Sequence, residues 1–272
     1  TLFPYTTLFR SILVFNEEEC SLKGKKGIIL GVANRSSIAY GCAAAFRHLG
    51  AEVGLTYLNE KAKRFVEPVA EELESPVFMP CNVEEPGQLE MVFEEAEKVW
   101  GKIDFAVHSI AFATKDDLHG RVIDCSAEGF ARAMDVSCHS FLRMSRLAEP
   151  LMEDGGSLFA MSYLGAERAV PNYNLMGPVK AALESCVRYL ALELGTKGIR
   201  VHAISPGPIH TRAASGIQGF DDLAAEAESR TPMKQLAGIR EVGMATAQLA
   251  LPTNHLTTGS TLYVDGGYNI VG

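Results

Sequence analysis

A tyrosine and a lysine seven residues apart, Tyr173 and Lys180, have the types and spacing in this sequence best suited to chemistry. Seven residues are two turns of an α-helix, so we expect both side chains on one helical face. An ammonium group beside a phenol stabilises the phenolate and lowers the pKa of the tyrosine. Such a pair could stabilise negative charge that develops on a substrate oxygen, or supply a proton to it. The spacing is also common on amphipathic helices, so a purely structural pair is the alternative.

Seven short apolar stretches, separated by longer helical patterns, must position this pair. They span 27–30, 52–57, 77–80, 104–110, 156–162, 200–205 and 261–266. Apolar strands that alternate with helices are typical of a parallel sheet covered on both faces. The predicted fold class is therefore α/β, with a Rossmann-like doubly wound seven-stranded parallel sheet and helices on both faces. Ligands bind such folds at the carboxyl ends of the strands, so the residues after each strand matter most.

The residues after the first predicted strand, GVANRSSIAYG (31–41), are suited to bind phosphate. Gly31 permits a tight turn, and a helix that begins near Ser37 and Ile38 directs backbone N–H groups toward an anion. Ser37 could both cap this helix and contact the phosphate. The usual G-x-G-x-x-G pattern is absent, so a serine-capped helix without a ligand is the alternative.

Residues at three other strand ends extend this interpretation to a dinucleotide. Asn82 and Val83 follow the third strand, where an amide could bind an adenine edge. Ser109 and Ile110 follow the fourth strand, where the backbone could approach a ribose and a nicotinamide. Leu58 follows the second strand, where an arginine or lysine would be needed to bind a 2′-phosphate. The sequence therefore favours NADH over NADPH.

The composition of the chain narrows its class. It has 272 residues, 47% of them hydrophobic, a net charge of −8 and six scattered cysteines without a CxxC pair. Such a chain suits one α/β domain in a reducing compartment, and its acidity argues against nucleic acid as the main partner. No apolar run approaches the length of a bilayer span. We therefore expect a cytoplasmic protein with no metal, no nucleic-acid partner and no membrane insertion.

The first 22 residues stand apart from the rest. Residues 1–11, TLFPYTTLFRS, match codon by codon the in-frame translation of a common sequencing adapter, and they lack the features of a secretory signal. We therefore expect 1–22 to be a leader of doubtful origin, with 1–11 an adapter artefact. Residues 23–272 are expected to form a single NAD-binding catalytic domain. A natural disordered leader is the alternative.

Five motifs connect the sequence to a known family: GVANRSSIAYG (31–41), VHSIAFA (107–113), SYLGAERAVPNYNLMGPVKAALE (162–184), ISPGPIHTRAASGI (204–217) and VDGGY (264–268). With them, 23–272 resembles the NADH-dependent enoyl-acyl-carrier-protein reductases of bacterial fatty-acid synthesis, a divergent branch of the short-chain dehydrogenases. An ordinary short-chain dehydrogenase has a catalytic serine where Ala160 stands here, and Tyr163 replaces that arrangement. This difference favours reduction of a carbon–carbon double bond over reduction of a ketone.

The resemblance implies hydride transfer from NADH to the β-carbon of a trans-2-enoyl thioester. The expected catalytic residues are Tyr173, which would stabilise the enolate oxygen, Lys180, which would hold the nicotinamide ribose, and Tyr163, which would line the acyl pocket. Ala113 is expected to contact substrate together with the two tyrosines. The expected cofactor contacts are Gly31, Ser37, Ile38, Leu58, Asn82, Val83, Ser109, Ile110, Lys180, Ile209, His210, Thr211, Arg212 and Ala213.

The resemblance also implies a lid and two kinds of partner. The segment 206–230 resembles the flexible loop that closes over substrate, and the acyl carrier protein would bear the substrate. Some relatives have lysines and arginines in this segment, suited to an acidic carrier protein, whereas Gln218, Gly219, Asp221 and Asp222 stand here. We therefore expect the carrier protein to dock elsewhere or weakly. The other implied partners are further copies of the chain, in a homotetramer.

Two other functions stay open. A 3-oxoacyl reductase could use the same fold, although it would need a serine in place of Ala160. A regulator that binds NAD(H) without turnover is also possible on this fold, although it would be expected to lose Tyr173 or Lys180, and both are present.

Overall fold

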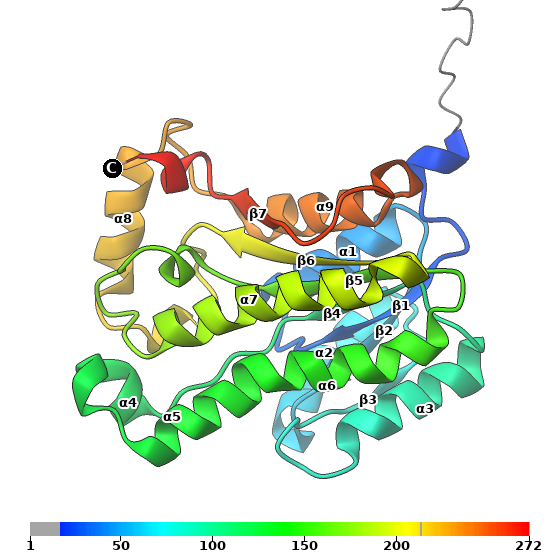
Figure 1. Ribbon diagram of the computed structural model, residues 1–272, viewed down its shortest axis with the longest axis horizontal. Helices are drawn as coiled ribbons and strands as arrows, with labels where there is room; N and C mark the ends of the chain where they lie inside the picture. Colours follow the sequence, from blue (N-terminus) through cyan, green and yellow to red (C-terminus); the bar gives the residue numbers. More distant parts are fainter. Residues whose placement is uncertain (1–16, 213, 272) are drawn as a thin grey trace, which may run out of the picture.

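Residues 17–212 and 214–271 are described by the structure, a computed structural model of the chain (Figure 1). The residues assigned to an adapter, 1–11, lie outside the described part, as does the expected cofactor contact Ala213. No helix within the two described ranges combines the length and the apolar character needed to cross a bilayer.

The strands of the described residues form a seven-stranded sheet in the order β3-β2-β1-β4-β5-β6-β7, with every neighbouring pair parallel. The first strand, β1, lies inside the sheet; β2 and β3 are added on one side of it, and β4 to β7 are added in turn on its other side. This order confirms the predicted doubly wound fold. The strand order reverses between β1 and β4, and ligands bind such sheets at the carboxyl ends of the strands beside that point. The strands are β1 (Lys26–Leu30), β2 (Glu52–Tyr57), β3 (Phe78–Pro80), β4 (Phe105–His108), β5 (Gly156–Met161), β6 (Ile199–Pro206) and β7 (Thr261–Val264).

Helices cover both faces of this sheet, as predicted (Figure 1). They are α1 (Ile38–His48), α2 (Glu60–Glu72), α3 (Gln88–Trp100), α4 (Lys115–His119), α5 (Ala127–Met134), α6 (Ser140–Ala148), α7 (Met176–Leu194), α8 (Phe220–Arg230) and α9 (Ile239–Ala250). Shorter helical turns include the π-helical η3 (Asp135–His139) and the 3₁₀ turns η5 (Leu164–Ala166) and η7 (Ala214–Gly216).

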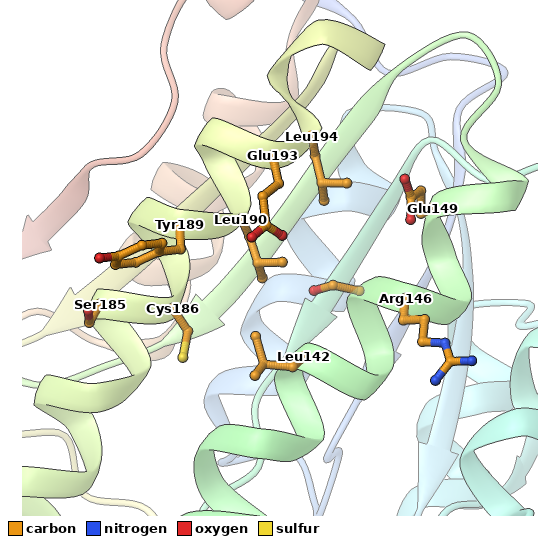
Figure 2. A pocket seen from close by; sticks show the side chains of 10 residues that line it. Leu142, Arg146, Glu149, Ser185, Cys186, Tyr189, Leu190, Glu193 and Leu194 are labelled. Carbon is orange, nitrogen blue, oxygen red and sulfur yellow. The ribbon is translucent and has the colours of Figure 1, made fainter.

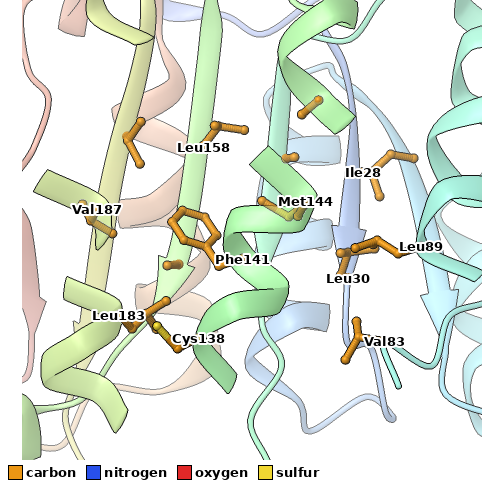
Figure 3. Packing of buried hydrophobic residues seen from close by; sticks show 14 of the residues in the cluster. Ile28, Leu30, Val83, Leu89, Cys138, Phe141, Met144, Leu158, Leu183 and Val187 are labelled. Atoms are coloured by element: carbon orange, nitrogen blue, oxygen red, sulfur yellow. The ribbon is translucent and has the colours of Figure 1, made fainter. Parts of the chain in front are cut away.

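Two apolar cores hold the layers together. One contains Ile28 and Leu158 with side chains of α6 and α7 (Figure 3), and the other contains Ile29 and Phe159 with side chains of α1 and α9. Neighbouring strand residues point to opposite faces of a sheet. The near-continuous apolar strands therefore bury both faces, which is why the sequence pattern predicted helices on each side.

The segment 206–230, expected as one flexible loop, is a loop only in its first half. Its second half is the helix α8, so the loop prediction was wrong there. Asp221 and Asp222 lie in the first turn of α8, where negative charge favours a helix N-terminus. Phe220 and Ala224 are buried in a small apolar cluster. The burial of these two side chains therefore stabilises α8 against the rest of the chain.

Candidate active site

Tyr173 lies in a turn immediately before α7, and Lys180 lies in the second turn of that helix. The prediction that both side chains project from one helical face was therefore wrong. Asn172 and Asn174 have positive φ angles of 64° and 42°, which a right-handed helix does not allow, so α7 begins only at Met176. Tertiary packing, and not helical spacing, brings the tyrosine and the lysine to the same end of α7.

The rings of Tyr163 and Tyr173 pack against each other, with centroids 4.7 Å apart and planes inclined by 58°. Tyr163 follows β5 and precedes the turn η5. Gly165 in that turn leaves room for the pair, because a Cβ there would lie 2.4 Å from Cδ1 of Tyr173. The Tyr163 hydroxyl is buried and has no hydrogen-bond partner among the described residues. Since an unpaired buried hydroxyl is costly, a polar group of a bound molecule would stabilise it.

Burial governs the protonation of Tyr173. The side chain is 8% exposed, and burial raises the pKa of the phenol well above its ordinary value, with smaller contributions from Tyr163 and Glu184. The expectation that Lys180 lowers this pKa was therefore wrong for the free protein. The Lys180 ammonium instead donates a hydrogen bond of 2.6 Å to the Met161 carbonyl oxygen. Tyr173 is thus a neutral phenol at neutral pH, suited to donate a hydrogen bond.

Lys180 is a buried ammonium group that titrates close to neutral pH. Its side chain is 4% exposed. Burial lowers the pKa of Lys180 to about 8, and the nearby Cys138 and Glu184 oppose this effect. The hydrogen bond to Met161 ties the ammonium to the carboxyl end of β5, the strand that leads into Tyr163. The three predicted catalytic residues therefore share one end of the sheet.

A buried carboxyl group, not predicted from the sequence, lies beside these residues. Glu184 follows Lys180 by one turn of α7 and is 5% exposed, and the Ser162 hydroxyl donates to its Oε1. Burial raises the pKa of Glu184, while hydrogen bonds from Ser162 and Thr261 lower it. The available signal was the spacing, because residues four apart on a helix are neighbours on one face.

The backbone segments that follow β1 and β4 meet at Gly31. Its φ is +90°, and a Cβ there would lie 2.2 Å from the Ser109 carbonyl oxygen and 3.2 Å from Cγ1 of Ile110. The backbone that follows β1 therefore touches the backbone that follows β4, and only glycine fits between them. Ser37 caps the adjacent helix α1, where its Oγ accepts a hydrogen bond of 3.3 Å from the Tyr40 backbone N–H. The structure thus brings four predicted cofactor contacts together at the carboxyl ends of β1 and β4.

A hollow of about 720 Å³ opens between the turn after β1 and the loop after β6. The turn contributes Asn34 and Ser36, and the loop contributes His210, Thr211 and Arg212. Three predicted cofactor contacts from the loop after the sixth strand therefore line a hollow together with the turn that is suited to phosphate.

The remaining predicted contacts lie near the carboxyl ends of the strands or in the core clusters beside them. Leu58 follows β2, is 54% exposed and does not line the hollow. Asn82 follows β3, where its Oδ1 accepts a hydrogen bond of 3.1 Å from the Glu84 backbone N–H, and Val83 is buried. The partly buried Ala113 packs against the core cluster that contains Tyr173. Ile38 and Ile209 pack against the core cluster on the opposite face.

A second hollow, of about 420 Å³, lies between α6 and α7 (Figure 2). Leu142, Cys186 and Tyr189 are among its lining residues, and none of the predicted site residues is. It is therefore not the site of the expected chemistry. Across 17–212 and 214–271, no group of three or more metal-ligating side chains gathers in one place.

Comparison with known proteins agrees with this arrangement. The model of the family described as enoyl-(acyl carrier protein) reductase matches residues 31–269. The NADH-dependent enoyl-acyl-carrier-protein reductase 1 of Rhizobium meliloti is 47% identical over 251 residues, which cover 92% of each chain.

Solved structures give the same result. The enoyl-acyl-carrier-protein reductase of Anaplasma phagocytophilum in complex with NAD is 45% identical with a TM-score of 0.89, over 92% of this chain and 96% of that one. The Bacillus cereus reductase, solved with NADP⁺ and an indole naphthyridinone, is 40% identical with a TM-score of 0.90, over 92% and 98% of the two chains. On this evidence the chain belongs to the enoyl-acyl-carrier-protein reductase family, as its five motifs indicated.

Proposed function

We propose that this chain reduces trans-2-enoyl thioesters with NADH, in the elongation of fatty acids. The observation that carries the proposal is the packed pair Tyr163 and Tyr173 at the carboxyl end of β5, with Ala160 inside the strand. Ala160 is fully buried and has no hydroxyl, so the serine-assisted ketone chemistry of a 3-oxoacyl reductase lacks its donor. The presence of both Tyr173 and Lys180 disfavours a regulator without turnover.

Bound NADH would supply the hydride, and the side chains would stabilise the charge that follows. The neutral phenol of Tyr173 donates a hydrogen bond to the thioester carbonyl oxygen, where negative charge develops. The Tyr163 hydroxyl, which has no hydrogen-bond partner within 17–212 and 214–271, pairs with a polar group of the bound substrate. The Lys180 ammonium binds the hydroxyls of the nicotinamide ribose.

The residues at the carboxyl ends of the strands fit a dinucleotide. Gly31 lets the backbones that follow β1 and β4 lie against each other, because a Cβ there would lie 2.2 Å from the Ser109 carbonyl oxygen, and the capped N-terminus of α1 is suited to the pyrophosphate. His210, Thr211 and Arg212 line the hollow that opens beside the turn after β1. The exposed Leu58 offers no charge to a 2′-phosphate, which supports a preference for NADH over NADPH.

The proposal is tested by NADH oxidation with two matched substrates, a trans-2-enoyl thioester and a 3-oxoacyl thioester of equal chain length. We expect consumption of NADH with the enoyl thioester alone. Consumption with the 3-oxoacyl thioester would assign the chain to ketone reduction. Tight binding of NADH with neither substrate consumed would assign it to regulation.

The pKa of Lys180 predicts how activity depends on pH. We expect kcat/KM for NADH to be level below pH 8 and to fall above it, because Lys180 loses its positive charge as the pH rises through about 8. The profile is measured with saturating enoyl thioester. In Lys180→Arg the fall should disappear from this range, because a guanidinium stays charged. A fall that persists unchanged in the arginine variant would contradict the role given to Lys180.

We further propose a substrate carried by acyl carrier protein and a homotetrameric, cytoplasmic enzyme with one catalytic domain, 23–272. Asp221 and Asp222 on α8 repel an acidic partner, so the carrier protein docks away from that helix. Tyr189 and Leu192 on α7 are 66% and 78% exposed, an apolar surface suited to subunit contact. Light scattering of the purified chain tests the assembly, with four times the 29.4 kDa chain mass expected.

A further inference from the structure

Glu184 is a buried titratable group that the proposed chemistry leaves without a role. It lies on α7 with 5% of its surface exposed. A buried carboxyl group is costly unless it is paired and hydrogen-bonded. Its position one turn after Lys180 places it on the face that meets the end of β5.

Two successive residues at the end of β5 are held by two successive turns of α7. The Met161 carbonyl oxygen accepts a hydrogen bond of 2.6 Å from Nζ of Lys180, and the Ser162 hydroxyl donates to Oε1 of Glu184. The Ser162 backbone N–H donates a hydrogen bond of 2.7 Å to the Ile204 carbonyl oxygen of β6. The segment that leads into Tyr163 is therefore tied to α7 on one side and to the sheet on the other.

Charge adds a second connection between Glu184 and the site. The carboxyl group raises the pKa of Lys180, against the larger effect of burial, and it also raises the pKa of Tyr173. The other titratable groups facing Glu184 or Lys180 are Arg188 on α7, Glu167 after η5, Tyr263 on β7, His108 on β4 and Cys138 on η3. Of these, Cys138 alone joins Glu184 in raising the pKa of Lys180.

We propose that Glu184 is a positioning residue that keeps Lys180 charged and holds the end of β5 through Ser162. This inference rests on the proposed function, because the group it supports is the lysine that binds the nicotinamide ribose. Glu184 does not touch the reacting atoms; its effect passes through Lys180 and through the segment that carries Tyr163.

Two substitutions separate the two effects. Glu184→Gln keeps an amide oxygen that can accept the Ser162 hydrogen bond but removes the charge. We expect the pH at which kcat/KM falls to move down by about one unit, at the low end of the ~1–3 units by which a nearby opposite charge shifts a pKa. The variant should then lose activity about tenfold at pH 9 and almost none at pH 6.5. Ser162→Ala keeps the charge but removes the tie, so it should raise KM for NADH at every pH.

The measurements need a control and a readout that does not depend on turnover. Glu193→Gln removes an exposed carboxylate from the same helix, and it should leave the pH profile unchanged. NADH binding is titrated by its fluorescence, and the Kd of Glu184→Gln should rise with pH from a lower pH than that of the parent chain. Thermal unfolding of each variant shows whether it folds.

The outcomes distinguish this inference from the proposed function. A parent chain that binds NADH but does not reduce the enoyl thioester would overturn the function, while the titration of NADH binding would still test Glu184. A Glu184→Gln variant with the parent's pH profile and NADH Kd would overturn the inference and leave the function intact. A loss of equal size at pH 6.5 and pH 9 would also overturn it, because it would mark general damage and not a missing charge.

Discussion

Replacing Tyr173 by phenylalanine should lower kcat with a trans-2-enoyl thioester by a factor of about 10²–10³, the usual effect of losing one donor to a developing oxyanion. The substitution removes only the hydroxyl, and the ring keeps its contact with Tyr163. Because burial holds Tyr173 in its protonated form, the lost group is a hydrogen-bond donor. The KM for NADH should change little. Steady-state kinetics at pH 7 provide the measurement.

A matched control is available on the same helix. Tyr189 is 66% exposed on α7. Tyr189→Phe removes only a hydroxyl and keeps the ring that is proposed for subunit contact, so this variant should keep the parent's kcat. If Tyr173→Phe retained more than a third of the parent's kcat, the hydroxyl would have no part in the chemistry. Tyr163 would then be the better candidate for the hydrogen-bond donor, because its hydroxyl is buried beside Tyr173 and has no partner among the described residues.

Gly31→Ala should abolish NADH binding and lower the thermal stability of the chain. A Cβ at this position would lie 2.2 Å from the Ser109 carbonyl oxygen, so the backbones after β1 and β4 must separate. Those two strand ends are expected to hold the dinucleotide. The positive φ of +90° adds strain of ~1–3 kcal/mol for any residue with a side chain. NADH fluorescence and thermal unfolding measure the two effects separately.

Gly87→Ala is a control that has the backbone strain but not the clash. Gly87 has a similar φ of +85°, yet a Cβ there would meet nothing within 4 Å. It should lose stability through strain alone and bind NADH as the parent does. Equal NADH affinities in the two variants would show that the strand ends beside Gly31 are not the dinucleotide site.

Much of the fold could be predicted because each strand is a short apolar run. A strand buried on both faces needs apolar residues at successive positions, as in β1 and β5, and such runs are visible without knowledge of their partners. The end of each strand also marks where ligands bind in this architecture, so Gly31 and Ser109 could be singled out as candidates from their positions, whereas His210 was implied by the family resemblance. The second half of the segment 206–230 was predicted as a loop but is the helix α8. The side chains of this helix are buried by packing in an apolar cluster, which includes residues outside the helix such as Ala214 and Leu236.

The sequence by itself determined the class of fold and the family, and it marked Tyr163, Tyr173 and Lys180 as the predicted catalytic residues, because these follow from residue types and their order along the chain. Only the tertiary structure decided the conformation and the protonation of these three side chains. Left-handed turns at Asn172 and Asn174 keep Tyr173 out of the helix that carries Lys180. Protonation depends on what surrounds a group in space, and burial holds Tyr173 as a phenol while it brings the pKa of Lys180 down to about 8.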